Sequence, residues 1–179
     1  MESKKQAFAG IHVVEFTGFA AGPVVGKHMA DHGAEVVRVE SATRPDGFRT
    51  HYPPFKDDIP GLNRSGCFAI FNNDKYSMTL NLRHSKSIEL AKRMVAWANV
   101  VIENFTPGTM KKLGLDYETL SGVNPKLVYA RASGYGAKGP EGNRPSLDGA
   151  ALARCGFLDG VTPKDGPPPY PGGGIADQM

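Results

Sequence analysis

Apolar segments of two kinds alternate along most of the chain. Short, nearly continuous apolar runs predict buried strands, and they cover residues 10–17, 34–40, 99–105 and 127–136. Runs with apolar residues at helical spacing predict helices, and they cover residues 24–33, 85–98, 109–115, 116–123 and 146–156. Strands that alternate with helices indicate an α/β fold with a doubly wound, mainly parallel sheet.

Local signals predict where some of these elements end and where the long loops lie. Gly33 is placed to stop the first helix, and Ser85 or Ser87 is placed to cap the helix over 85–98. The short apolar segments FAIFNN and SMTLNL flank Asn73, Asp74 and Lys75. Residues 41–66 are polar and rich in Pro and Gly, which predicts a long loop of the kind that often carries function.

Composition narrows the class of protein. Of 179 residues, 40% are hydrophobic and 22% are charged, which is typical of a globular domain. The net charge of +3 is too small to favour nucleic acid, although it suits an anionic ligand. No apolar run is long enough for a membrane span or a signal peptide. Cys67 and Cys155 form no CxxC motif, which favours free thiols in a cytoplasmic protein.

The turn FTGFAAGP follows the first predicted strand. Ligands of open parallel sheets bind at the carboxyl ends of the strands, and a turn of small residues before a helix lets the backbone approach an anion. Glu40, at the end of the second predicted strand, is spaced like the acidic ribose contact of a dinucleotide site. The glycine spacing is G-x-x-x-G, however, so tight helix–strand packing is an equally good explanation.

A second candidate is the segment ENFTPGTMKKLGL. Asn104 and Phe105 end a predicted strand, and Lys111 and Lys112 lie on the helix that follows. Such a corner suits an adenine ring and phosphates, although an ordinary strand–turn–helix with solvated lysines has the same pattern. No metal site is predicted, because His28 and His32 share a helix face without an identifiable third ligand.

Taken together, several segments resemble one enzyme family. They are GIHVVEFTGFAAGP, HGAEVVRVE, NDKYSMTLNLR, NVVIENFTPGTMKKLGLDYETL, NPKLVYARASGYGAKGP and GGGIADQM. In this order they are similar to the N-terminal part of family III CoA-transferases of the CaiB/BaiF type, which include formyl-CoA, carnitine and benzylsuccinate CoA-transferases. The resemblance implies that residues 1–179 form a Rossmann-like CoA-binding domain, with a second domain absent from this chain.

The resemblance implies a set of ligand contacts. The residues matching CoA- or pocket-contacting positions of the family are Gly18, Phe19, Ala20, Ala21, Lys75, Asn104, Phe105 and Lys112. Ser41 stands where the family often has Arg or Pro, and Arg44 or Arg49 is a candidate replacement for a phosphate contact. CoA and acyl-CoA are then substrates, and no tightly bound cofactor is expected. The loop over 51–64 suits either an acyl pocket for a bulky or aromatic acid or a plain surface.

The resemblance also implies a nucleophile. Asp177 matches the family's catalytic aspartate, whose carboxylate would form a mixed anhydride and then an aspartyl-CoA thioester. Backbone N–H groups of residues 172–174 could stabilise the oxyanions. A racemase branch of the family has a histidine immediately before Asp148; this chain has Leu147 there, which disfavours proton exchange. Asp148 itself is expected to cap the following helix.

Three functions therefore remain open. The first is CoA transfer between an acyl-CoA and a carboxylic acid, within the interlocked dimer that the resemblance implies. The second is a dinucleotide-dependent oxidoreductase that uses the first strand–helix–strand unit and Glu40. The third is a non-catalytic subunit that binds CoA, which the retained Asp177 argues against.

Overall fold

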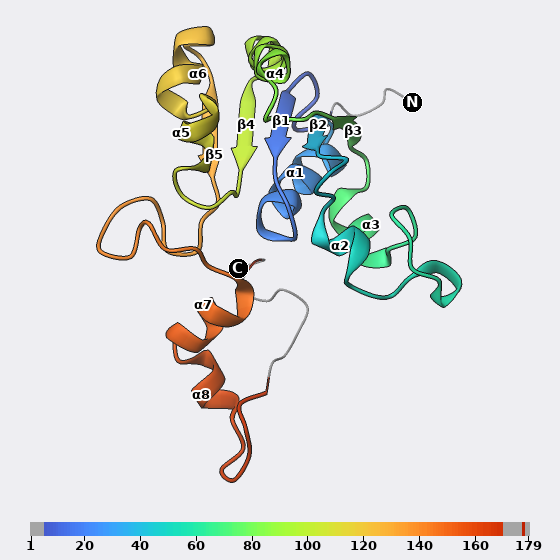
Figure 1. Cartoon of the computed structure of the whole chain (residues 1–179), viewed down its shortest axis with the longest axis vertical. Coiled ribbons are helices and arrows are strands. Elements are labelled where there is room, and N and C mark those ends of the chain that lie inside the picture. The colour runs from blue at the N-terminus through green and yellow to red at the C-terminus, as the bar shows by residue number, and fades with distance from the viewer. Residues whose placement is uncertain (1–5, 170–176, 178–179) are drawn as a thin grey trace.

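A single parallel sheet organises the chain. The computed structural model describes residues 6–169 and Asp177. Five strands lie in the order β3-β2-β1-β4-β5, all parallel (Figure 1). They are β1 (His12–Phe16), β2 (Glu35–Glu40), β3 (Tyr76–Thr79), β4 (Val100–Glu103) and β5 (Val128–Arg131). With β1 in the centre and the chain winding outward in both directions, this is the predicted doubly wound α/β fold.

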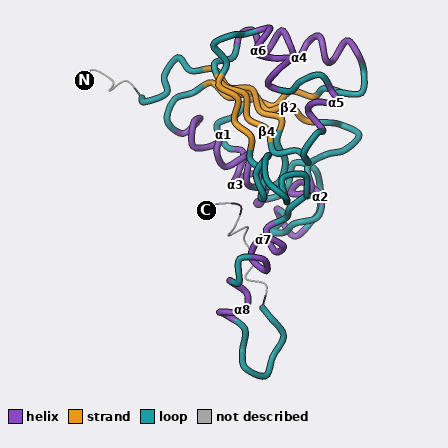
Figure 2. Tube along the Cα trace, turned by 90° about the vertical axis from the view of Figure 1, so that its left-hand side faces the viewer, coloured by secondary structure: helices purple, strands orange, loops and turns teal. Residues whose placement is uncertain are grey.

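Helices cover both faces of the sheet (Figure 2). On one face lie α1 (Ala21–Asp31) and α3 (Gly66–Asn72), which contact each other. The opposite face is covered by α4 (Ser85–Trp97), α5 (Thr109–Leu113) and α6 (Tyr117–Val123). The loop after β2 contains α2 (Gly47–Thr50) and the 3-10 turn η1 (Lys56–Asp58), and α7 (Asp148–Arg154) and α8 (Phe157–Val161) follow the sheet.

Alternation along β1 divides its apolar side chains between the two faces of the sheet. Val14 and Phe16 point into the core cluster that also contains Val95 on α4. Val13 points to the other face and packs with Ile102. Each of these side chains is at most 1% exposed, and burying a side chain of this size contributes about 1.5–3 kcal/mol. The sheet is therefore fixed from both sides, which holds the carboxyl ends of its strands in place.

Some predicted boundaries are confirmed and others are wrong. Gly33 follows α1 with a φ of 99°, as expected of a helix-terminating glycine. The segment FAIFNN forms helix α3, because the Ser65 hydroxyl accepts a hydrogen bond from the Phe68 N–H at 3.1 Å and caps it. Neither predicted serine caps α4: His84 is the N-cap, and its Nδ1 accepts from the Lys86 N–H at 3.3 Å.

An arm made of α7 and α8 lies beyond the carboxyl ends of the strands (Figure 1). Leu147 is the N-cap of α7, and Asp148 is its first residue, so the predicted capping role of Asp148 is wrong. Cap geometry needs an extended backbone at the capping residue, and Leu147 has it. None of the helices in the described part of the chain is both long and apolar enough to cross a bilayer.

Candidate functional site

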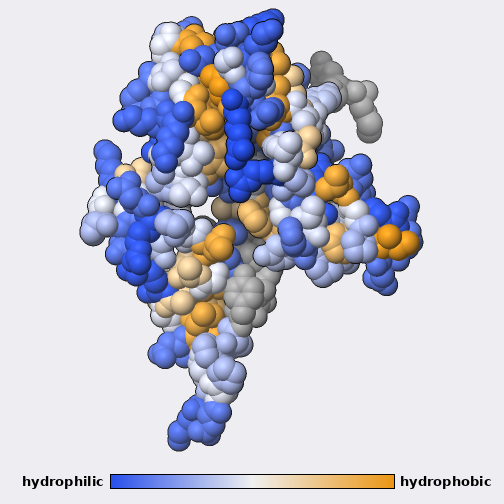
Figure 3. All heavy atoms as spheres, viewed as in Figure 1, coloured by the Kyte–Doolittle hydropathy of each residue, from blue (hydrophilic) through white to orange (hydrophobic). Residues whose placement is uncertain are grey.

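A large cavity opens where the strands end. Its volume is about 1540 Å³, and Figure 3 shows the face hollowed between the sheet and the arm, with hydrophilic side chains above the hollow and apolar side chains of the arm below. Loops after all five strands and the arm contribute to its lining. This is the end of an open parallel sheet at which ligands bind, and the topology reverses here at β1 and β4.

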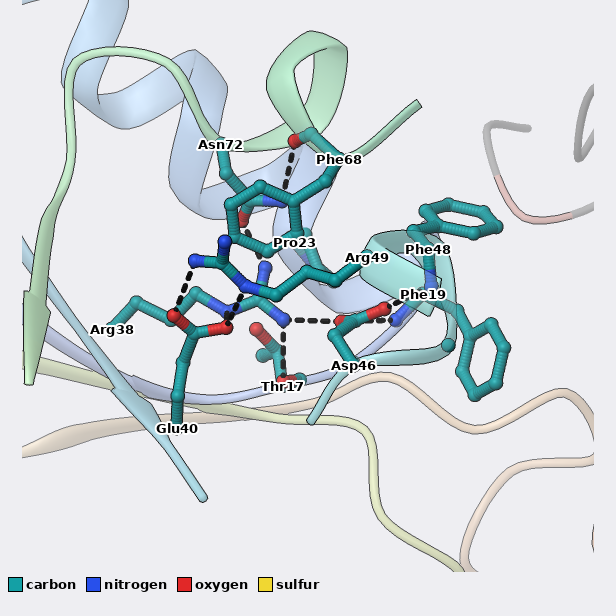
Figure 4. Close-up of polar contacts among 12 residues, drawn as sticks. Thr17, Phe19, Pro23, Arg38, Glu40, Asp46, Phe48, Arg49, Phe68 and Asn72 are labelled. Carbon is teal, nitrogen blue, oxygen red and sulfur yellow. Dashed lines mark hydrogen bonds and ion pairs between the residues drawn. The ribbon is translucent and has the colours of Figure 1, made fainter. Parts of the chain in front are cut away.

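The turn after β1 is held by side chains from other segments. The Asn104 side chain accepts from the Gly18 N–H at 2.9 Å and donates to the Gly18 carbonyl at 2.8 Å. Arg38 donates to the Thr17 carbonyl at 3.2 Å. Asp46 accepts from the Phe19 N–H at 3.0 Å (Figure 4). Three consecutive residues of the cavity wall therefore have their backbone groups fixed from β2, the loop after β2 and the residue that follows β4.

Glycines on α1 allow the helix to approach this turn and the strand behind it. A Cβ at Gly22 would lie 2.6 Å from Thr17 and 2.9 Å from Asn104. A Cβ at Gly26 would lie 1.9 Å from a carboxylate oxygen of Glu15. Gly22 of the predicted G-x-x-x-G turn thus serves close helix–strand packing, one of the two explanations that the sequence offered, whereas a Cβ at Gly18 would meet only Asp46 at an ordinary 3.6 Å.

Glu40 and Arg49 form an ion pair beside the turn (Figure 4). Arg49 donates to both carboxylate oxygens of Glu40, at 3.0 and 2.7 Å, and its guanidinium lies 3.4 Å from the centre of the Phe68 ring. Burial acts to raise the pKa of Glu40, but hydrogen bonds from Arg49 and Ser77 outweigh it and lower the pKa. Both partners are occupied, so neither the ribose contact predicted for Glu40 nor the phosphate contact suggested for Arg49 is available without breaking this pair.

Lys75 lies in the interior and not among the cavity-lining residues. Its ammonium donates to Glu15 at 2.9 Å and to the Pro23 carbonyl at 2.7 Å, and both charged side chains are at most 2% exposed. Burial lowers the pKa of Lys75 and raises the pKa of Glu15, while the attraction between them opposes both changes. The structure therefore places Lys75 apart from the other predicted CoA contacts.

Aromatic side chains form one end of the cavity. Phe19 contacts Phe48 and Tyr52 edge to face, with ring centroids 5.5 and 6.4 Å apart, and Phe48 stacks on Phe71 at 5.4 Å. Phe19 and Tyr52 line the cavity and are 42% and 47% exposed. Edge-to-face contacts stabilise such clusters beyond simple burial. The sequence had suggested the loop over 51–64, which contains Tyr52, as either an acyl pocket or a plain surface, but it carried no signal that joined Tyr52 to Phe19.

Cationic side chains lie elsewhere on the lining. Arg44, Arg83 and Lys112 line the cavity and are exposed. In the described part of the chain, none of these three side chains makes an ion pair. They are available to the phosphates of a ligand, which bind most strongly to cations that have no carboxylate partner.

Asp177 reaches the same cavity from the end of the described chain. Its side chain lines the cavity, and its backbone N–H donates to Asp148 at 3.3 Å. Burial, together with the negative charge of Asp148, raises the pKa of Asp177. A partly desolvated carboxylate is a stronger nucleophile than one in bulk water. Residues 172–174, predicted to stabilise oxyanions, lie outside the described residues.

Comparison with known proteins identifies the family. The model of CoA-transferase family III matches residues 8–179. This chain belongs to CoA-transferase family III. A succinate–glutarate CoA-transferase of Agrobacterium fabrum is 36% identical over 99% of this chain and 44% of its own length. A CAIB/BAIF family protein of Brucella suis, known from its crystal structure, superposes with a TM-score of 0.87 at 38% identity, over 97% of this chain and 46% of its own.

The relatives differ in the acids that appear in their names. A cinnamoyl-CoA:phenyllactate CoA-transferase of Clostridium sporogenes is 34% identical over the whole of this chain and 43% of its own length. The chain therefore spans less than half the length of these family III relatives. The resemblance to this family and the predicted α/β fold are confirmed.

Most of the residues predicted from the family meet in one place. The cavity lining includes Gly18, Phe19, Ala21, Asn104, Phe105, Lys112 and Asp177. Ala20 is fully buried at the start of α1, and Lys75 is paired with Glu15. The roles assigned to these residues in family III remain predictions. In the described residues no group of three His, Cys, Asp or Glu side chains is arranged to hold a metal ion.

Sequence reasoning missed two contributors to the site. Asp46 holds the turn, and Arg83 adds a cation to the lining. The Asp-Gly step at Asp46 and Gly47 is a turn signal, but it gives no indication of a partner as distant along the chain as Phe19. Arg83 follows a short apolar segment, and only the parallel pairing of β3 with β2 brings it to the carboxyl edge.

Proposed function

We propose that this chain forms the CoA-binding and nucleophile-bearing part of an acyl-CoA:carboxylate CoA-transferase. The observation that carries the proposal is the presence of the Asp177 carboxylate in the same cavity as the turn at Gly18 and the cation Lys112. A thioester needs a nucleophile beside its acyl carbon and cations near its phosphates. This cavity offers both, and its volume accommodates a ligand as long as CoA.

The proposed reaction proceeds by exchange at carbonyl carbons. A carboxylate oxygen of Asp177 attacks the donor thioester, and CoA leaves as a thiolate to give a mixed anhydride. The thiolate then attacks the aspartyl carbonyl, which releases the donor acid and leaves an aspartyl-CoA thioester. The acceptor carboxylate repeats the two steps in reverse, so that Asp177 is regenerated and no proton or ATP is consumed.

Covalent trapping tests the nucleophile. Hydroxylamine added with an acyl-CoA during turnover should convert Asp177 to a hydroxamate that mass spectrometry locates. The assay is run on the chain alone and on the chain extended by the additional length that its relatives possess. Asp177→Ala should abolish both the adduct and transfer while CoA still binds. Asp159→Ala, which removes an exposed acid on α8 outside the cavity, is the matched control.

Two results would contradict the proposal. An adduct on another residue would show that a different nucleophile acts, and transfer that persists in Asp177→Ala would show that this carboxylate is not needed. A third result would favour the non-catalytic subunit: CoA binds to the extended wild type and to the extended Asp177→Ala variant, but the extended wild type shows no transfer.

Ligand protection separates the transferase from the oxidoreductase. CoA should raise the melting temperature of the chain, because a ligand that binds only the folded state stabilises it, and NAD should not. The engagement of Glu40 by Arg49 argues against a dinucleotide ribose at this position. Protection by NAD alone would favour the oxidoreductase. The exposed Leu147, which lines the cavity where a racemase would have histidine, argues against proton exchange.

The complete protein is proposed to act as an interlocked dimer on an acyl-CoA and a carboxylic acid. The partial coverage of the relatives supports a contribution from a second domain. Size-exclusion chromatography with light scattering on the chain and on its extended form tests the dimer, which should appear only in the extended form.

A further inference from the structure

The backbone of Phe19 has a conformation that phenylalanine avoids. Its φ is 58°, in the left-handed region. Among the described residues, the other non-glycine residues with positive φ are Asp57, Asp58 and Asp74, and aspartate tolerates this region far better than a bulky residue. Strain of this kind persists only where neighbouring contacts enforce it, and it concentrates at functional sites.

Asp46 supplies the contact that enforces it. One carboxylate oxygen accepts from the Phe19 N–H at 3.0 Å, and the other accepts from the Phe48 N–H at 2.7 Å at the start of α2. The first oxygen also pairs with Arg38 (Figure 4). Both charged side chains of this pair are 2% exposed. The ion pair therefore fixes the carboxylate independently of its hydrogen bond with the Phe19 N–H.

The strain places an aromatic ring on the cavity wall. The Phe19 ring packs over Gly47, where a Cβ would lie only 2.6 Å from the ring. Its free side faces the cavity beside Tyr52. If the residue relaxed to an ordinary φ, the Cα–Cβ bond would turn, and the ring would leave both contacts. The hydrogen bond from Phe19 to Asp46 is therefore linked to the shape of the wall.

We infer that Asp46 is a positioning residue for this site. It holds Phe19 in the left-handed conformation, and through Phe19 it shapes the part of the cavity that the acyl-CoA occupies. The identification of the occupant as a CoA thioester rests on the proposed function. The role of Asp46 in holding the turn does not depend on it. Asn104 holds the neighbouring residue Gly18 without any such strain, because Gly18 is not among the residues with positive φ.

A comparison of glycine with alanine at position 19 tests the inference. Both Phe19→Gly and Phe19→Ala remove the ring, but only glycine adopts the left-handed conformation without cost. Asp46→Asn should weaken CoA binding, measured by calorimetry with CoA itself, about tenfold in the wild type. The loss should be smaller but still present in Phe19→Ala, which lacks the ring but keeps a residue that avoids the left-handed conformation. In Phe19→Gly the same substitution should change the affinity less than about twofold.

Asn104→Ala is the matched control, since it frees the same turn at a residue without strain. Its effect on CoA affinity should be the same in the Phe19→Gly and Phe19→Ala backgrounds. A purely structural role for Asp46, as the partner of Arg38, would likewise give equal effects in both backgrounds. Equal effects of Asp46→Asn would therefore overturn the inference.

Two measurements need no CoA and keep the inference testable if the wild type does not bind it. The Phe19 amide, followed by NMR hydrogen exchange, should exchange at least about tenfold faster in Asp46→Asn. With Asp46 intact, Phe19→Gly should unfold at a higher urea concentration than Phe19→Ala. Unchanged protection, or a less stable glycine variant, would contradict the role of Asp46. Absence of CoA binding in the wild type would contradict only the proposed function.

Discussion

Two groups of cations in this molecule differ in what neutralises them. Arg38 and Lys75 are buried, Arg49 is 15% exposed, and all three are paired with carboxylates. Arg44, Arg83 and Lys112 are exposed on the cavity lining and have no ion-pair partner among the described residues. A cation that folding has already paired can bind a phosphate only by giving up its carboxylate, and that loss is large in a buried site. The first group therefore maintains the shape of the site, and the second is available to the ligand.

Among the variants that test this division, Lys75→Met is expected to have the largest effect. Removing the ammonium leaves the buried Glu15 carboxylate without a counter-charge, so we expect a loss of about 3–5 kcal/mol in the free energy of unfolding at pH 7. Urea denaturation measures it. CoA affinity of the folded fraction should be unchanged. A stable variant that fails to bind CoA would instead place Lys75 among the ligand contacts.

The pKa of Glu15 determines how the stability loss of Lys75→Met changes with pH. Burial raises the pKa of Glu15 above 4.5 in the folded state, so the stability linked to its protonation is fully present below pH 4.5 and is lost as the pH rises through the higher folded value. The deficit of Lys75→Met relative to the wild type should therefore shrink toward pH 4.5. The double variant Glu15→Gln with Lys75→Met should recover most of the loss at pH 7.

Arg49→Met should have an intermediate effect, about 2 kcal/mol, because it removes two hydrogen bonds to Glu40 and the contact with the Phe68 ring. The pKa of Glu40 lies below 4.5 in the folded state. Its contribution is therefore present above pH 4.5 and is lost as the pH falls through the lower folded value. Thermal unfolding between pH 3 and 7 should show a smaller acid-dependent change in the variant. Arg93→Met, at an exposed position on α4, should stay within about 0.5 kcal/mol of the wild type.

Lys112→Ala should leave stability within about 0.5 kcal/mol and weaken CoA binding by up to about fivefold. The loss should fade as salt is added, since an exposed cation acts through a screened field. Calorimetry at low and high ionic strength measures it, with the exposed Lys86→Ala on α4 as the control. A loss that does not depend on salt would show that Lys112 acts through packing.

The smallest effect is expected from Asp148→Asn. Burial and the charge of Asp148 raise the pKa of Asp177 above 3.8, and only the carboxylate form attacks a thioester. The acid limb of the pH profile of kcat/KM should therefore lie above pH 3.8 and should move down by less than about one unit in Asp148→Asn. Asp159→Asn should not move it. An upward shift would mean that Asp148 does not act by its charge.

The fold could be predicted from the sequence because its signals are local. Apolar runs such as VVIE and helical periodicity such as that of 85–98 depend on neighbouring residues, and β4 and α4 form where these signals lie. The helix α3 was less evident, because seven residues are too few to separate helical from strand periodicity. Its capping serine, Ser65, was the signal that could have decided it.

Strand-end signals indicated two parts of the site, the turn FTGFAAGP and the segment ENFTPGTMKKLGL, but each also had an ordinary structural explanation. The family resemblance supplied the remaining positions. Lys75 looks the same in the sequence as Lys112, and only the parallel packing of β1, β3 and α1 shows that one of them meets Glu15 in the interior. In the same way, nothing near Asp46 in the sequence indicates that it would hold Phe19. Contacts between residues far apart in the chain depend on topology, which local patterns do not encode.

The hydrogen bonds between Asn104 and Gly18 join residues 86 positions apart. Because the central strand comes first in the chain and β4 is added after α4, the ribosome has released most of this domain before the turn can acquire its final partner. We expect the cavity to be the last region to mature during synthesis, with β1 to β3 assembled earlier. A nascent chain halted before Val100 would then hold a partial sheet whose ligand-binding edge is still unformed.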